Sequence, residues 1–129
     1  MKTTYFLLSI VLFVSCQSEQ NSNEDELTEH PFVHTAYFWF TPGLSLDEKE
    51  SFIRDCEKLR EVETVQAFYS GGPANTNRAV IENTYDYAVV FHFKDLEDQE
   101  YYQQHPLHLS MIEKHQDKWA KVMVTDIEH

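Results

Sequence analysis

Two segments of this chain are apolar at almost every position, so neither offers a sheet face suited to water. Residues 32–40 read Phe-Val-His-Thr-Ala-Tyr-Phe-Trp-Phe, and residues 85–93 read Tyr-Asp-Tyr-Ala-Val-Val-Phe-His-Phe. Both are rich in the β-branched and aromatic residues that favour strands. Because side chains alternate across a strand, a sheet with one solvated face is polar at every second position. We therefore predict a sheet that is covered on both faces.

The segments around these two strands alternate between helix and strand patterns. Ser45 and Glu48 have the spacing of a capping box, which starts a helix with an apolar stripe that includes Phe52 and Cys56. The predicted order is strand 32–40, helix from residue 46, strand 62–69, loop 70–77, strand 85–93, a helical region interrupted at Pro106 and ending near residue 118, and strand 121–127. This βαββαβ order predicts an α+β, ferredoxin-like fold, a four-stranded antiparallel sheet with the helices on one face.

The helices of such a fold leave the second apolar face of the sheet uncovered. The simplest cover is a second copy of the chain, packed sheet against sheet by two-fold symmetry. We therefore predict a homodimer that forms a dimeric α/β barrel. The alternative is a monomer in which the uncovered face is an apolar groove for a ligand.

The N-terminal residues have the pattern of an export signal. Lys2 is followed by an uncharged apolar run over residues 5–14, which is too short for a membrane-spanning helix of about 20 residues. Ser15 and Cys16 then resemble the end of a bacterial lipobox. We predict a lipoprotein signal peptide over residues 1–15, lipidation of Cys16, and an exported protein anchored on the periplasmic or cell-surface face of a bacterial membrane. The alternative is a soluble secreted protein in which Cys16 is incidental.

Residues 16–29 are polar and acidic, which predicts a flexible tether between the lipid and a domain spanning residues 30–129. The whole chain has 22 acidic residues against 10 Lys and Arg, a net charge of −12. Such a surface repels phosphate backbones and anionic headgroups, so we expect no nucleic-acid partner and no electrostatic adsorption to membranes. The chain has only three Gly and no phosphate loop, CxxC, HExxH or GxSxG motif, and we predict no cofactor.

The most informative stretch for chemistry is residues 102–108, which read Tyr-Gln-Gln-His-Pro-Leu-His. Pro106 favours the first turn of a helix, which places His105 at the N-cap and His108 in that turn. The positive end of the helix dipole disfavours imidazolium there, and a neutral imidazole can act as a general base. Tyr102 places a phenol nearby. His34 shares its side of the first strand with apolar residues, so it faces a cavity or a buried partner.

Two plainer interpretations of these residues remain open. Histidines at helix caps are often structural, and His34 could bond only to backbone.

His105 and His108 have a spacing seen in zinc sites, but the sequence offers no clear third ligand, so we predict no metal. Cys56 lies on the apolar stripe of the first helix and is expected to be a buried, inert thiol.

A series of short motifs follows in order along the chain: Val33-His34, Thr41-Pro42-Gly43, Tyr85-Asp86-Tyr87-Ala88-Val89-Val90-Phe91, Phe93-Lys94-Asp95, Tyr102-x-x-His105-Pro106-x-His108 and Val122-x-Val124-x-Asp126. With these motifs the chain resembles the stress-responsive A/B barrel (Dabb) family over roughly residues 30–127. The resemblance implies a ferredoxin-like fold and a homodimeric barrel. One plant member of the family is a cyclase that performs an aldol condensation, and its acid/base pair corresponds to Tyr102 and His108.

The resemblance thus implies that Tyr102 and His108 are catalytic and that His34 and His105 are ligand-binding candidates, with His105 either structural or shaping the pocket. Arg78, in the loop, is a further candidate for an anion contact at the pocket rim. Together these expectations favour a lipid-anchored domain that binds a small, largely apolar ligand in a homodimeric barrel. The alternatives are a cyclase- or isomerase-type enzyme that uses His/Tyr acid–base chemistry on a carbonyl compound, and a non-catalytic structural or stress-protective dimer.

Overall fold

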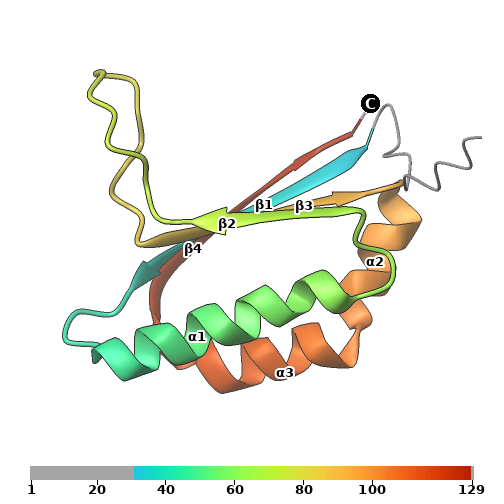
Figure 1. The fold of residues 1–129 in the computed structure, drawn as a ribbon, viewed down its shortest axis with the longest axis horizontal. Helices are drawn as coiled ribbons and strands as arrows, with labels where there is room; N and C mark the ends of the chain where they lie inside the picture. Colours follow the sequence, from blue (N-terminus) through green and yellow to red (C-terminus); the bar gives the residue numbers. More distant parts are fainter. Residues whose placement is uncertain (1–30, 129) are drawn as a thin grey trace, which may run out of the picture.

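Four antiparallel strands form one sheet in the order β2-β3-β1-β4, with three helices on one of its faces (Figure 1). The computed structural model describes residues 31–128, so the predicted signal peptide, Cys16 and the tether lie outside the described part. The elements are β1 Phe32–Phe40, α1 Leu46–Lys58, β2 Ala67–Gly71, β3 Tyr87–Phe93, α2 Leu96–Gln104, α3 Pro106–His115 and β4 Trp119–Ile127. This is the predicted ferredoxin-like arrangement.

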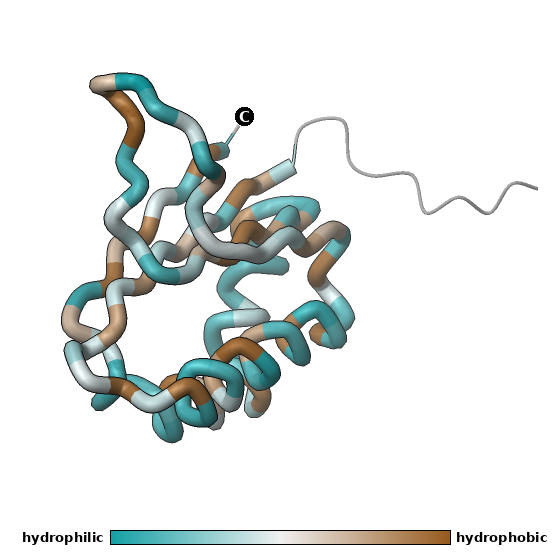
Figure 2. The backbone as a smooth tube through the Cα atoms, turned by 60° about the vertical axis from the view of Figure 1, so that its left-hand side comes forward, coloured by the Kyte–Doolittle hydropathy of each residue, from teal (hydrophilic) through white to brown (hydrophobic). Residues whose placement is uncertain are grey.

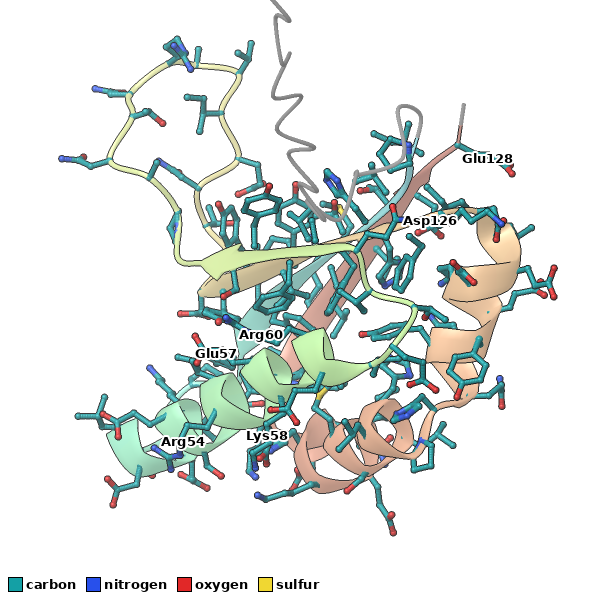
Figure 3. All side chains as sticks on the ribbon, turned by 45° about the vertical axis from the view of Figure 1, so that its right-hand side comes forward. Arg54, Glu57, Lys58, Arg60, Asp126 and Glu128 are labelled. Carbon is teal, nitrogen blue, oxygen red and sulfur yellow. The ribbon has the colours of Figure 1, made fainter. Side chains whose placement is uncertain are left out.

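Helix α1 begins at the predicted capping box. The Ser45 hydroxyl accepts a hydrogen bond from the Glu48 backbone N–H at 3.3 Å, and the Glu48 carboxylate accepts one from the Ser45 N–H at 2.9 Å. These bonds satisfy two N–H groups that the first turn of the helix cannot pair internally. Hydrophilic and hydrophobic positions alternate along α1 in Figure 2, and Phe52 and Cys56 on its inner side are fully buried. The charged residues Arg54 and Lys58 project from the helix in Figure 3.

The second helical region is divided at Pro106, as the sequence predicts. The Asp95 side chain caps α2 by accepting from the Asp98 N–H at 3.1 Å. Helix α2 ends at Gln104, His105 is extended, and Pro106 is the first residue of α3. Short 3₁₀ turns follow α1 at Leu59–Glu61 and α3 at Gln116–Lys118. No helix within residues 31–128 is long and apolar enough to cross a membrane.

The second strand is displaced from its predicted position. We predict a strand over residues 62–69, whereas β2 runs from Ala67 to Gly71. Val62 is only 1% exposed, and its carbonyl accepts the Val65 N–H at 2.9 Å in a turn that precedes the strand. Residues 62–65 are therefore apolar because they pack in the core, and not because they pair as a strand of the sheet. The third strand starts at Tyr87 instead of Tyr85, and the fourth at Trp119 instead of Lys121.

The core fills the space between the sheet and the helices. Phe52 of α1 occupies its centre and makes edge-on contacts with the rings of Phe38 and Tyr87. The buried apolar residues are Phe32, Ala36, Phe38, Phe52, Cys56, Leu59, Val62, Tyr87, Val89, Phe91, Phe93, Tyr102 and Met111. The strand residues among them lie on one side of β1 and β3, as the alternation of the sequence predicts.

The opposite face of the sheet is aromatic and only half-buried. Tyr37, Trp39 and Val90 lie on this face, and no described helix covers it (Figure 1). The loop between β2 and β3 rises on the same side and ends against it, because Tyr85 contacts the rings of Tyr37 and Trp39. The Lys121 ammonium lies 4.1 Å from the centre of the Trp39 ring. Both faces of the sheet are therefore apolar, and the described chain covers one of them.

Candidate functional site

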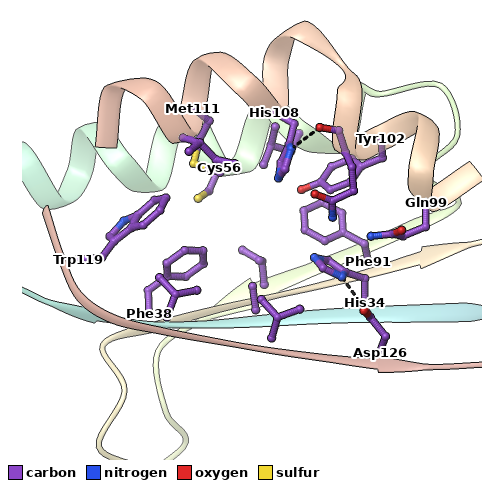
Figure 4. Close-up of a pocket in the computed structure, with 17 residues that line it drawn as sticks. His34, Phe38, Cys56, Phe91, Gln99, Tyr102, His108, Met111, Trp119 and Asp126 are labelled. Carbon is purple, nitrogen blue, oxygen red and sulfur yellow. Dashed lines mark hydrogen bonds and ion pairs between the residues drawn. The ribbon is translucent and has the colours of Figure 1, made fainter. Parts of the chain in front are cut away.

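A cavity of about 320 Å³ lies between the sheet and the helices (Figure 4). Its polar lining residues are His34, Gln99, Tyr102, Gln103, His108 and Asp126. Figure 4 shows the labelled polar residues toward one end of the cavity, and Phe38 and Trp119 toward the other. The cavity thus has a polar end that can bond to ligand oxygens and an end walled mainly by aromatic rings, where the Trp119 Nε1–H is buried without a hydrogen-bond partner among the described residues.

The mouth of the cavity lies along the edge strand β4. Val122 and Val124 line the cavity and are nevertheless 40% and 49% exposed. Asp126 lines it as well, with a side chain that is 46% exposed. Within residues 31–128, no strand pairs with the outer side of β4. A ligand would therefore enter across the side chains of this strand.

His34 is held at the polar end by the register of the sheet. Strands β1 and β4 pair so that His34 lies directly opposite Asp126. Residues that face each other across an antiparallel pair have their side chains on the same side of the sheet. The His34 Nδ1–H accordingly donates to the Asp126 carboxylate at 2.6 Å. In the neutral tautomer that makes this bond, Nε2 is an acceptor. His34 therefore lines the cavity, one of the two predicted surroundings, whereas its partner Asp126 is largely exposed.

His108 is the residue best suited to take a proton from a ligand. It lies in the first turn of α3, is 7% exposed, and its Nδ1 is 3.0 Å from the Gln103 carbonyl oxygen. Because a carbonyl only accepts, Nδ1 carries the proton, and Nε2 keeps a lone pair. Burial lowers the pKa of His108 below its ordinary value of 6.5, and the proximity of His34 lowers it further. The ring is therefore neutral at pH 7 and is a base at Nε2.

Tyr102 lies beside His108 and complements it as a donor. The two ring centres are 4.6 Å apart, and that of His34 is 6.1 Å from Tyr102. Burial raises the pKa of the Tyr102 phenol well above its ordinary value, so the hydroxyl keeps its proton at neutral pH. This hydroxyl makes no hydrogen bond to another described residue, and Figure 4 shows the ring turned into the cavity.

Two of the residues proposed from the sequence lie elsewhere. His105 caps α3, where its Nδ1 accepts the Leu107 N–H at 3.2 Å and its Nε2 is 3.6 Å from the Glu63 carboxylate. Arg78 is exposed on the loop between β2 and β3. Neither residue lines the cavity. Within residues 31–128, no three His, Cys, Asp or Glu side chains form a group that could hold a metal ion.

The sequence model of the stress responsive A/B barrel domain, Dabb, matches residues 32–129 of this chain. The chain belongs to the Dabb family. The match covers every strand and helix described above, including the whole cavity lining. A comparison with curated protein sequences finds no match.

Solved structures share the fold of this Dabb chain. The Arabidopsis thaliana protein At3g17210 has 23% identity and a TM-score of 0.66, over 77% of this chain and 95% of its own. A dimeric ferredoxin-like protein of unknown function from Thermobifida fusca has 19% identity and a TM-score of 0.65, over 80% and 94%. A hydroxynitrile lyase from Passiflora edulis has 18% identity and a TM-score of 0.64, over 77% and 93%. At these identities the similarity establishes the fold.

The Dabb cavity also contains three polar residues to which the sequence assigns no role, namely Gln99, Gln103 and Asp126. The sequence places Asp126 on the last strand, but only the pairing register of β1 and β4 shows that it lies opposite His34. Gln99 lies one helical turn before Tyr102, and this i, i+3 spacing puts both side chains on one face of α2. Gln99 is 7% exposed and lines the cavity. The spacing from Tyr102 is the signal that identifies it.

A third buried histidine of the Dabb domain, His115, lies outside the cavity lining. His115, at the end of α3, is fully buried, and its Nε2–H donates to the Asp55 carboxylate of α1 at 2.9 Å. Its Nδ1 is 3.2 Å from the Lys118 ammonium. Asp55 also accepts from Lys114 at 2.6 Å and from Lys58 at 2.9 Å. Both ring nitrogens of His115 are therefore bonded, and the cluster joins α1 to α3.

Proposed function

We propose that this protein is an exported, lipid-anchored Dabb homodimer that binds a small, largely apolar ligand carrying an oxygen function. The observation that supports binding is that two polar groups without hydrogen-bond partners in the described part of the chain face the same cavity. His108 Nε2 and the Tyr102 hydroxyl make no hydrogen bonds to other described residues, and both side chains line the same cavity. Buried polar groups are costly unless they are bonded, so a ligand oxygen that meets them is stabilised there.

The arrangement of the same two residues favours acid–base catalysis as a second candidate. His108 Nε2 would remove a proton from the carbon next to a ligand carbonyl. The electron pair of that C–H bond would move toward the carbonyl oxygen and form an enolate. The Tyr102 hydroxyl, which keeps its own proton, would donate a hydrogen bond to this oxygen. A cyclase, an isomerase or a lyase can use such a step, and one protein with this fold is a hydroxynitrile lyase.

The homodimer is supported by the uncovered aromatic face of the sheet. Tyr37, Trp39 and Val90 would be shielded from water if a second copy packed there. The Thermobifida fusca protein with the same fold is dimeric. The lipid anchor rests on the sequence of residues 1–16 alone. Cys16→Ser should release the protein from membranes, and intact mass should show the lipid on the wild-type chain and none on the variant.

Native mass spectrometry of the full chain, purified from its host, tests the binding proposal. We expect a dimer that carries a fixed additional mass beyond the lipid, and this mass should be reduced or absent in His108→Ala. A dimer without any additional mass would contradict ligand binding and favour the structural or stress-protective alternative. A monomer would contradict the barrel.

Hydrogen–deuterium exchange of a ketone tests the catalytic candidate. The methyl protons of 4-hydroxyacetophenone exchange slowly in D₂O, and NMR follows their loss. The wild-type chain should accelerate this exchange, and His108→Gln should reduce the acceleration about a hundredfold or more. His92→Gln is the matched control, because His92 lies on β3 outside the cavity lining. Equal exchange rates with His108→Gln and His92→Gln would contradict catalysis by His108 and leave ligand binding as the proposed function.

A further inference from the structure

We propose that the cavity selects an uncharged ligand with two oxygen functions, one bound by His108 and Tyr102 and the other by the Gln99 carboxamide. This inference rests on the proposed function, because it assumes that the cavity is a ligand site. It adds the class of ligand and assigns Gln99 as the residue that determines specificity.

The charges around the cavity exclude an anionic ligand. None of the lining residues is Lys or Arg, so Arg54 and Lys58, which project from α1 in Figure 3, are not part of the lining. His34 has the Asp126 carboxylate within 2.6 Å, so any charge on its ring is already matched. A carboxylate or phosphate that entered would lose its hydration without meeting an unpaired cation. The net charge of −12 would also repel it during approach.

Gln99 supplies a polar contact that the protein itself does not use. The residue is 7% exposed, and its side-chain amide makes no hydrogen bond to another described residue. Figure 4 shows the amide at the cavity wall, on the same side as His34. Polar groups in a protein interior usually have a partner, and the Gln99 amide, which keeps some accessible surface at the cavity, can find one in a ligand. Because it both donates and accepts, it suits a neutral hydroxyl or carbonyl oxygen.

The size and walls of the cavity define the rest of the ligand. A volume of about 320 Å³ lies at the lower end of the range for ligand pockets, roughly 300–1,000 Å³. Phe38, Val89 and Phe91 provide apolar walls between and beyond the polar residues. These features fit a single ring or a short chain with oxygens at two positions. A neutral hydroxyketone of that size is the simplest compound of this class.

Three probes of similar size separate these requirements. 4-Hydroxyacetophenone is neutral and has both oxygens, 4-methylacetophenone lacks the hydroxyl, and 4-hydroxybenzoate is anionic. Calorimetric titration would use the full lipidated chain in nanodiscs, with empty nanodiscs as the blank for partitioning. We expect 4-hydroxyacetophenone to bind the wild type about tenfold more tightly than 4-methylacetophenone, since one net hydrogen bond contributes about that factor. It should also bind at least as much more tightly than 4-hydroxybenzoate, because the carboxylate loses hydration without meeting an unpaired cation.

Gln99→Leu should remove the preference for the hydroxyl, by weakening 4-hydroxyacetophenone about tenfold while leaving 4-methylacetophenone unchanged or tighter. Gln104→Leu is the matched control, because it makes the same change at an exposed position of α2 outside the lining. If Gln99→Leu fails to fold, Gln99→Met provides an unbranched apolar replacement for the same titrations.

The possible failures are distinguishable. Equal or tighter binding of 4-hydroxybenzoate to the wild type would overturn the requirement for a neutral ligand. An unchanged preference in Gln99→Leu, or an equal loss in Gln104→Leu, would overturn the role of Gln99. Both results would leave the cavity as a ligand site. If none of the three probes bound the wild type, the proposed binding function itself would fail.

Discussion

His108 and His115 lie on the same helix, about two turns apart, and both are buried, yet their surroundings differ. Both ring nitrogens of His115 are bonded, one to Asp55 and the other to Lys118. His108 has one nitrogen bonded to a backbone carbonyl, and its side chain lines a cavity. Burial of a polar group is therefore not enough to identify a functional site. The informative combination is a buried group with an unused bonding position and a space in front of it.

The largest difference should appear in stability. His115→Ala removes a fully buried ring that contacts Phe52 and leaves Asp55 without one of its donors. We expect the free energy of unfolding to fall by about 3 kcal/mol. His108→Ala, at a cavity wall, should cost about 1 kcal/mol or less. Urea denaturation followed by circular dichroism measures both, and equal losses would remove the distinction between the two histidines.

The Asp55 cluster should make the protein sensitive to acid. Partial burial alone would raise the pKa of Asp55, but the hydrogen bonds from Lys114, Lys58 and His115 outweigh it and hold the pKa well below 3.8. The stability from this carboxylate is therefore complete above about pH 4 and is lost as the pH falls further. Asp55→Asn should cost about 2 kcal/mol at pH 7.

Unfolding measurements from pH 7 to pH 2 check this sign. The stability gap between wild type and Asp55→Asn should narrow as the pH decreases below 4. A gap that stays constant over this range would show that the carboxylate contributes by its shape and not by its charge.

The lowered pKa of His108 has a separate and smaller pH signature. The folded state resists protonation of the ring, whereas the unfolded chain takes up the proton near pH 6.5. Stability should therefore decrease as the pH falls below 6.5, and His108→Gln should lessen that decrease. Nitrogen NMR should show the Nδ1–H tautomer at pH 7 and a titration midpoint below 6.5. A midpoint above that value would mean that the site holds an imidazolium.

The smallest effect is expected at the mouth of the cavity. The Asp126 side chain is 46% exposed, so the energy of its bond to His34 is reduced by solvent. Asp126→Ala should lower the free energy of unfolding by about 0.5 kcal/mol, and the His34 Nδ1 proton should exchange faster in NMR spectra. A loss as large as that of His115→Ala would place Asp126 among the structural residues.

The sequence predicts the residues whose roles depend on local order. The Ser45–Glu48 capping box, the break at Pro106 and the cap at His105 depend on neighbours a few positions away, and all three are present. The side of β1 on which His34 lies follows from alternation alone. The expectation that His34, Tyr102 and His108 share one site comes from the resemblance to the Dabb family, because local order alone does not bring residues of distant elements together.

Other features depend on how distant segments align and cannot be read from local order. Asp126 bonds to His34 only because β4 pairs with β1 in one register, and a shift by one residue would turn it to the opposite face. The apolar residues Val62 and Val65 resemble a strand in sequence but form a buried turn. Arg78 lies on the exposed loop between β2 and β3, outside the cavity lining. The sequence does not show where this loop projects relative to the cavity.

Pro106 has an effect on chemistry as well as on shape. In an uninterrupted helix the Gln103 carbonyl would accept the N–H of Leu107, four residues later. Because the helix is broken, that N–H bonds to the His105 ring instead, and the carbonyl is left to bond His108. One imino acid thereby decides which nitrogen of a histidine two positions further along holds the proton. The orientation of His108 is thus set by a backbone carbonyl that the broken helix leaves unpaired. A substitution at Pro106 can therefore alter this orientation without changing Gln103 or His108.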